Sequence, residues 1–325
     1  MSGPVNIGKT TAPKIVGAIN WHLVALPIII VGLLLAMLSK GAALVITDVL
    51  IMVLFASSLN FIISFGGMVS FGHAAYFGLG AYGLALSVAK FGLPVWSGFL
   101  MGPIIATFAA LAFGALCVRL SHIYFAMLTL ACGEITYTIL FQAYDYTGGD
   151  NGITNFMVPS LGLDPRLFGL AVLIVVTTCL VLMWRVVNSP FGLVIRAVGE
   201  EPHRAAALGY SPRTVNLLAF SLAGLFAGIA GALFACQQGN AFPEYAGLTF
   251  AIEALVMVVI GGLRSFSGGI YGAVVYTLLK TFLPRYTGVW ELVIGIILIV
   301  IVLAFPQGCS GGLKMLRKMW GGKAE

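Results

Sequence analysis

Long apolar stretches, separated by short polar segments, follow one another along the whole chain. Those of membrane-spanning length cover residues 22–39, 43–65, 68–89, 94–117, 122–144, 167–187, 215–238, 251–263, 268–283 and 288–305. In lipid a spanning segment must pair its own backbone groups, which favours helices over open strands. The pattern therefore predicts an all-α integral membrane protein with about ten transmembrane helices, some of them short or broken.

Glycines interrupt two regions of this pattern. Residues 261–269 form a glycine-rich joint, and the stretches on either side of it could be two short spans or one broken pair. The stretch 68–89 is also rich in glycine, and such helices can pack closely or break where a substrate path requires it. The second and seventh stretches could further belong to an inverted repeat, with 71–76 and 266–271 as counterparts.

Composition requires lipid as the main solvent. Hydrophobic residues make up 60% of the chain and charged residues 9%, against about 25% charged residues in soluble domains. We expect the 325 residues to form one membrane domain without a second soluble domain. The five cysteines lack metal-ligand spacing. The net charge of +6 does not come with interleaved basic and aromatic residues, so we expect no nucleic-acid binding.

The distribution of lysine and arginine predicts the orientation in the membrane. With the N-terminus in the cytoplasm and alternating spans, twelve basic residues lie inside and four outside, as the positive-inside rule requires. This assigns both termini to the cytoplasm. Residues 1–21 have no apolar core and are expected to be a tail rather than a removable signal peptide. A permease domain would cover 22–305, with a cytoplasmic loop at 188–214 and a basic tail at 306–325.

Two nucleotide-binding patterns occur without the structural context they need. Residues 3–10, GPVNIGKT, match the phosphate-binding loop letter for letter, but only two residues precede them and no strand can do so. Residues 78–83 match G-x-G-x-x-G inside a predicted span, where small residues for helix packing are the better interpretation. We therefore expect no cofactor on this chain; if ATP drives its activity, another subunit hydrolyses it.

The inner loop 188–214 contains two predicted helical stretches. Residues 189–192, SPFG, end the sixth span, and a short helix can start after them. Glu200, Glu201 and a following proline then open a second stretch that stops at Gly209. The segment could dock on a partner protein or be a solvated amphipathic linker.

Several motifs in order resemble one transporter family, the branched-chain amino-acid permeases of ABC importers, and specifically their M-type subunit. The inner loop resembles the family's coupling loop, S-P-F-G-x-x-x-R-A-x-x-E-x-x-x-x-A-A-x-x-G. The other matching motifs lie at residues 60–78, 147–153 (TGGDNGI), 257–263 (MVVIGGL) and 306–308 (PQG). Ser64 is a mild departure from the family pattern.

The resemblance implies a multi-subunit importer in the bacterial inner membrane. Its partners would be a homologous permease subunit, two cytoplasmic ATPase subunits that hold ATP and Mg, and a periplasmic solute-binding protein. Branched-chain amino acids are the expected cargo; urea, short amides and other small organic solutes are the alternatives. Asp150 stands where many members have serine, which leaves the cargo open. The residues expected to couple to the ATPases are Arg196, Glu200, Glu201, Ala206 and Gly209.

The outer loop 144–166 is expected to receive the binding protein. Its glycines and polar residues suit an exposed turn, with Gly148, Gly149, Asp150 and Asn151 as contact candidates, although a plain linker is the alternative.

Polar residues within apolar spans are the other candidates for function. His73, Glu134 and Glu253 could line a translocation path or form structural pairs, because an embedded charge costs about 2.5–3.5 kcal/mol and needs protein or water around it. Such carboxylates also leave open an ion-coupled secondary transporter acting alone. A membrane enzyme is disfavoured, since no catalytic triad or metal cluster is evident.

Overall fold

The computed structural model describes residues 39–120, 122–154, 156, 164–263, 265–286 and 288–304. The predicted first span, apart from Ser39, and both predicted tails lie outside these residues. The helices are α2 (Lys40–Gly66), α3 (His73–Ala89), α4 (Val95–Cys117), α5 (His122–Gln142), α6 (Tyr144–Thr147), α7 (Pro165–Val187), α8 (Pro190–Glu200), α9 (Pro202–Ala207), α10 (Pro212–Gln238), α11 (Leu248–Gly261), α12 (Phe266–Phe282) and α13 (Trp290–Ala304). Three 3-10 turns are η1 (Gly149–Asn151), η3 (Pro243–Ala246) and η4 (Leu283–Arg285), and two short strands are β1 (Ile153–Thr154) and β2 (Asn240–Ala241).

The all-α class is correct, whereas ten spans are not confirmed. Within the described residues six helices are long and apolar enough to cross a membrane: α2, α4, α5, α7, α10 and α12 with its η4 extension. Helix α11 is apolar but has only 14 residues. The glycine-rich joint separates α11 and α12 as two helices.

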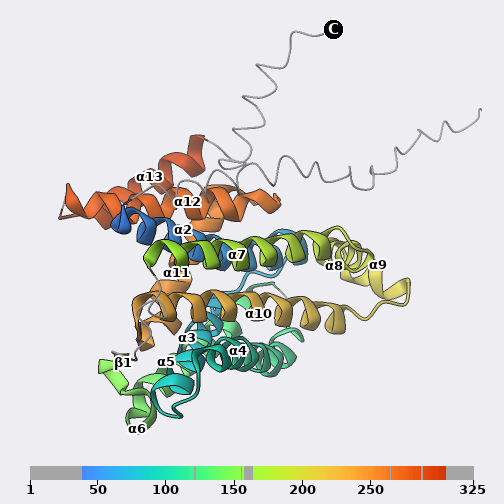
Figure 1. Ribbon diagram of the computed structural model, residues 1–325. Helices are drawn as coiled ribbons and strands as arrows, with labels where there is room; N and C mark the ends of the chain where they lie inside the picture. Colours follow the sequence, from blue (N-terminus) through green and yellow to red (C-terminus); the bar gives the residue numbers. More distant parts are fainter. Residues whose placement is uncertain are drawn as a thin grey trace, which may run out of the picture.

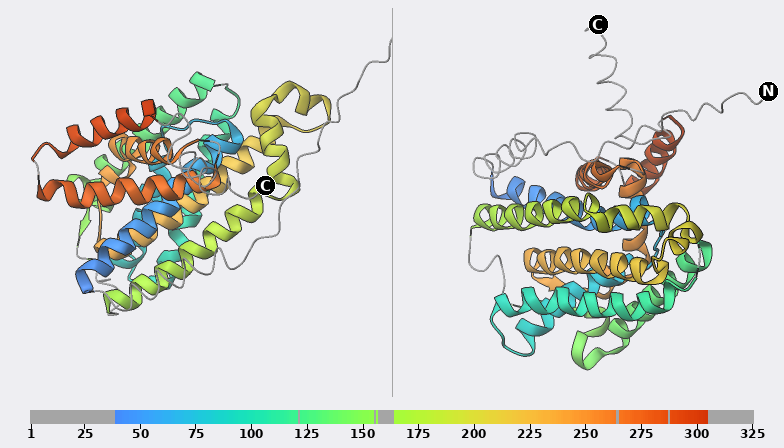
Figure 2. Two further views of the ribbon diagram at one scale, coloured as in Figure 1. Left: turned by 90° about the horizontal axis from the view of Figure 1, so that it is seen from above. Right: turned by 90° about the vertical axis from the view of Figure 1, so that its right-hand side faces the viewer.

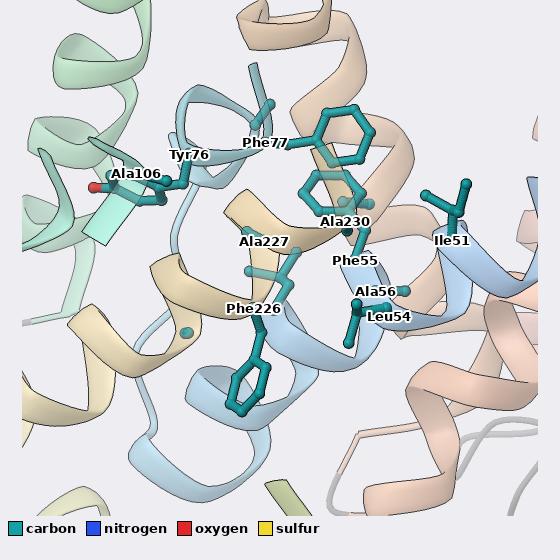
Figure 3. Close-up of a cluster of buried hydrophobic side chains, with 14 of the residues drawn as sticks. Ile51, Leu54, Phe55, Ala56, Tyr76, Phe77, Ala106, Phe226, Ala227 and Ala230 are labelled. Atoms are coloured by element: carbon teal, nitrogen blue, oxygen red, sulfur yellow. The ribbon is translucent and has the colours of Figure 1, made fainter. Parts of the chain in front are cut away.

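The helices form stacked layers around α2 and α10 (Figures 1 and 2). Helix α10 packs on α2, α3 and α4, and α2 packs on α7 and α12. Figure 3 shows the buried centre, where Phe55 of α2 and Phe77 of α3 lie with ring centroids 4.6 Å apart. Glycines bring the backbones together: a Cβ at Gly80 would come within 2.2 Å of the Gly228 carbonyl oxygen of α10. Gly80 thus serves helix packing, as proposed for the motif that contains it.

Loops predicted on one side of the membrane contact each other. At one end Lys40 lies 3.6 Å from Asp164, and β1 pairs antiparallel with β2, with Ile153 opposite Ala241. Segment 188–211, which carries α8 and α9, lies at the opposite end of the bundle (Figure 1). This grouping agrees with the predicted alternation of spans.

Helices α2 and α10 have features expected of repeat counterparts. Each has 27 residues and ends at a glycine in the left-handed region, Gly67 with φ 65° and Gly239 with φ 67°. Non-helical residues and a shorter helix follow in both cases, α3 in one and α11 in the other. This order pairs α3 with α11, so residues 266–271, which begin α12, are one helix too late to be the counterpart of 71–76.

Candidate functional site: a groove at a helix break and the segment that contacts it

A break between α2 and α3 interrupts the predicted span 68–89. Gly67 adopts a left-handed conformation and the Met68 N–H closes the helix end on the Ile62 carbonyl at 3.1 Å. The helix resumes only at His73, and the first five residues of the predicted span are therefore non-helical. Within the described chain the N–H groups of Val69 and Ser70 have no acceptor. Irregular backbone at membrane depth is tolerated where protein buries it or a cavity adjoins it.

Helix α5 holds the break in place. The Thr129 hydroxyl accepts a hydrogen bond from the Phe71 N–H at 3.3 Å. A Cβ at Gly72 would lie 1.9 Å from the Thr129 carbonyl oxygen, so only glycine allows this approach. The break is thus fixed by tertiary contact with another helix.

An apolar groove of about 620 Å³ lies beside the break. Three elements form it: the break itself, α5 and the start of α11. Its lining residues are Gly67, Val69, Phe71, Ile123, Ala126, Met127, Leu130, Leu248 and Ile252. The groove combines an apolar wall with one lining residue, Val69, whose N–H has no acceptor in the described chain, and can receive a ligand that has an apolar part and an anionic end.

Glu134 extends the groove-lining face of α5. It follows Met127 and Leu130 at helical spacing, is exposed, and has no hydrogen bond or ion pair within the described residues. It lies near the middle of this spanning helix. A carboxylate at this depth is costly in hydrocarbon, so this face requires water or another protein next to it.

The other two path candidates have different environments. Glu253 accepts hydrogen bonds from the Lys280 ammonium at 2.6 and 2.7 Å, which joins α11 to α12 as a structural pair. His73 is fully buried, lies 2.8 Å from the Ser58 hydroxyl through Nε2 and stacks on Phe55. Of the three candidates, Glu134 is the one on the groove-lining face.

Both predicted helices of the inner loop are present, as α8 and α9. The Ser189 hydroxyl caps α8 by accepting a hydrogen bond from the Gly192 N–H at 3.3 Å, and proline occupies the first turn. The SPFG residues therefore start α8, two residues after α7 ends at Val187, rather than only ending the previous helix. Gly209, with φ 92°, follows α9 in the left-handed region.

The predicted coupling residues divide into one anchor and an exposed group. Arg196 donates a hydrogen bond to the Val187 carbonyl at 3.2 Å and stacks over the Phe65 ring at 4.8 Å, so it ties α8 to the bundle. The other four are exposed: Glu200, Glu201, Ala206 and Gly209. Sequence reasoning missed the exposed apolar residues beside them, Leu208 and Tyr210 above all. The available signal was a large apolar residue on each side of Gly209, outside α9.

Helix α8 touches the break through glycine. A Cβ at Gly199 would lie 2.9 Å from the Phe65 carbonyl oxygen and the Gly66 carbonyl carbon, and Gly67 faces the Gly199 carbonyl in return. Gly67 also lines the groove. The predicted coupling segment and the groove therefore meet at one backbone contact.

Residues 148–151 of the outer loop form a tight turn in which two polar side chains are exposed. Gly148 and Gly149 have positive φ angles of 77° and 56° and shape the turn, whereas Asp150 and Asn151 are exposed. The Asn151 amide donates to the Tyr144 hydroxyl at 3.4 Å. Asp150 is thus a polar side chain available for contact at the end of the bundle opposite α8.

Comparison with known proteins places these features in a family. The family model described as "Branched-chain amino acid transport system / permease component" matches residues 41–303. The high-affinity branched-chain amino acid transport system permease protein LivM of Escherichia coli K12 is 28% identical over 318 residues, covering 89% of this chain and 74% of that protein. The probable branched-chain amino acid transport permease protein LivH of Methanocaldococcus jannaschii is 28% identical over 72% of this chain and 80% of its own length.

A permease named for a different cargo also matches. The galactofuranose transporter permease protein YtfT of Escherichia coli K12 is 29% identical over 66% of this chain and 62% of its own length. No solved structure gives a significant match. Because the family model covers most of the residues, the chain belongs to the branched-chain amino-acid permease family of ABC transporters and is a multi-pass membrane protein.

Proposed function

We propose that this chain is a permease subunit of an ABC importer and forms half of the translocation path for a branched-chain amino acid. ATP and Mg bind partner ATPases in the cytoplasm, a periplasmic binding protein delivers the cargo, and a homologous permease supplies the other half of the path. Both termini are cytoplasmic, as the basic residues favour. The inner loop 188–214 then faces the ATPases, and residues 148–151 face the binding protein.

The observation that carries this proposal is the groove beside the helix break. Its aliphatic lining suits the side chain of leucine, isoleucine or valine. The free N–H group of Val69 can donate to a carboxylate, and the Glu134 carboxylate can accept from an ammonium group. An apolar wall with a free backbone donor at Val69, and an acceptor further along the lining face of α5, matches an aliphatic amino acid better than urea or a sugar, which lack a large apolar part.

The exposed position of Glu134 supports a path between two subunits. Burial against lipid would cost this carboxylate several kcal/mol. A sister permease on the α5 face would remove that cost by enclosing a wet path, and would close the open side of the groove.

Reconstitution in liposomes tests the proposal. The complex of both permeases, ATPases and binding protein should take up labelled leucine only with ATP, and excess urea or galactofuranose should not compete. The chain alone should accumulate nothing under a proton or sodium gradient. Gradient-driven accumulation by the chain alone would establish a secondary transporter instead, and competition by urea or galactofuranose would change the cargo.

Glu134→Gln supplies the residue-level test. A hydrogen bond to a charged group contributes about 1.5–3 kcal/mol, so ATP-driven leucine uptake should fall by a factor of about 10 to 100. Glu291→Gln is the matched control, because Glu291 is an exposed carboxylate in the first turn of α13 and does not line the groove. Equal uptake in both variants would remove Glu134 from the path.

A further inference from the structure

A second cavity, of about 350 Å³, lies where the ends of several helices meet. The end of α2, the turn between α4 and α5, helices α8 and α9, and the start of α10 surround it. Its polar lining includes Arg119, His203 and Arg213, and apolar side chains such as Val118 and Phe125 complete the wall. It is distinct from the groove, although both touch Gly67.

The cationic side chains of this cavity lack counter-charges. In the described part of the chain neither Arg119 nor Arg213 forms an ion pair, and the lining contains no carboxylate. Glu200 and Glu201 directly precede the lining residue Pro202, but they neither line the cavity nor form an ion pair with either arginine. Two arginines around one cavity repel each other and attract an anion.

Asn216 adds a second, independent requirement. It lines the same cavity, and its side-chain oxygen is buried with no hydrogen-bond donor among the described residues. A buried acceptor left unpaired costs about 1–3 kcal/mol. The ligand that completes the cavity therefore needs a negative group for the arginines and a hydroxyl or similar donor for the amide.

The position of the cavity points to a lipid. Helix α4 ends at Cys117 and α5 begins at His122, so Arg119 lies at the level where spanning helices end. Apolar side chains beside it are well exposed, Leu120 at 44% and Ile123 at 71%. Acyl chains can cover these residues while a phosphate lies among the arginines, as occurs in basic pockets between membrane helices.

We propose that this cavity binds the phosphoglycerol headgroup of an anionic phospholipid. The phosphodiester pairs with Arg119 and Arg213, and a glycerol hydroxyl donates to the Asn216 oxygen. The bound headgroup joins the α4–α5 turn and α10 to His203 of α9, and so holds the predicted coupling segment against the bundle. A zwitterionic lipid would bring its own positive charge into a cationic cavity and bind less well.

The test measures lipid binding to the purified full-length chain in detergent. After delipidation, native mass spectrometry follows titration with phosphatidylglycerol or phosphatidylcholine. The double variant Arg119→Gln, Arg213→Gln should lose about thirtyfold in phosphatidylglycerol affinity, since each basic residue near the surface contributes about fivefold. Arg119→Lys with Arg213→Lys should retain most of the binding and shows that loss does not come from misfolding. Arg185→Gln, an exposed arginine of α7 outside the cavity, is the matched control.

Four results would overturn the proposal. Equal loss in Arg185→Gln would mean general surface attraction. Displacement of the lipid by millimolar inorganic phosphate would identify a site for a free anion. Equal affinity for phosphatidylcholine would exclude charge recognition. Absence of lipid binding, together with failure of the double variant to bind the ATPases, would make the cavity a contact for an acidic segment of a partner protein.

Discussion

Gly199→Ala is the sharpest test of how α8 and the groove communicate. The added Cβ would lie 2.9 Å from the Gly66 carbonyl carbon and from the Phe65 carbonyl oxygen. These are backbone atoms and cannot rotate away as a flexible side chain could. Either α8 moves outward or the end of α2 shifts, and in both cases the contact between Gly199 and Gly67 changes.

The expected magnitude follows from two opposing terms. Overpacking of this kind typically costs about 1–3 kcal/mol, whereas alanine in place of glycine within a helix gains about 1 kcal/mol. The substitution therefore destabilises the arrangement in which α8 contacts α2 by a net amount of about 0–2 kcal/mol. A change of 1.4 kcal/mol alters the ratio of two conformations about tenfold, so a penalty of about 2 kcal/mol would lower ATP-driven uptake by up to about thirtyfold.

The assay compares leucine uptake, ATP hydrolysis and thermal unfolding in the reconstituted complex. Gly199→Ala should lower the leucine uptake per ATP hydrolysed. We expect only a small accompanying change in the melting temperature. Gly295→Ala is the matched control, because Gly295 lies within α13 and a Cβ there meets nothing within 4 Å. If Gly199→Ala transports with wild-type stoichiometry, the Gly199–Gly67 contact does not carry coupling.

Three further predictions concern other contacts. Lys280→Met should destabilise the protein because it leaves Glu253 unpaired; a fully buried pair would lose about 3–5 kcal/mol, and the partial exposure of this pair lowers that cost. The double variant with Glu253→Gln should recover most of the melting temperature, and no recovery would contradict a structural pair. Glu201→Lys and Gly209→Leu should abolish stimulation of ATP hydrolysis by loaded binding protein without preventing membrane insertion, and wild-type stimulation in both would reject the coupling role. Asp150→Cys should crosslink to the binding protein in the assembled complex. If no crosslink forms and Asp150→Ala transports normally, the outer loop is only a linker.

The helices that the sequence predicted best are those with clear start and stop residues. Pro202 in the first turn and Gly209 after the last turn mark the limits of α9, because helix starts and left-handed ends are local requirements. Ser189 and Pro190, which were expected to end the preceding span, instead cap the start of α8. The class of the fold followed equally from apolar length. These features depend on a few neighbouring residues, so they can be derived without knowing the tertiary structure.

The start of α3 could not be derived in this way. Residues 68–72, MVSFG, are as apolar as a spanning helix, and hydropathy extends the helix through them. Helix α2 ends locally at Gly67, but what holds the following residues out of a helix as far as His73 is the contact of Gly72 with Thr129, 57 residues further along the chain. A break that depends on a distant helix leaves no distinctive local pattern apart from the glycines.

The embedded polar residues show the same limit. His73, Glu134 and Glu253 are alike as isolated polar residues in apolar stretches, yet one is in the core, one is exposed and one is paired. Their environments depend on which face each helix turns to its neighbours. Apolar periodicity cannot assign those faces in a membrane helix, because lipid and protein core both accept apolar side chains.

The arrangement around Gly67 explains how a small movement could open a path. Gly67 touches Gly199 of α8 on one side and lines the groove on the other, and its left-handed conformation is available to glycine at little cost. Packed helices do not deform continuously; if α8 transmits force as proposed, we expect α2 to shift between discrete arrangements. The break beside it has few backbone hydrogen bonds to lose, and it can therefore change shape at lower cost than the intact helices around it. An uninterrupted helix in place of residues 67–72 would transmit the same force by tilting as a rod, without reshaping the groove wall.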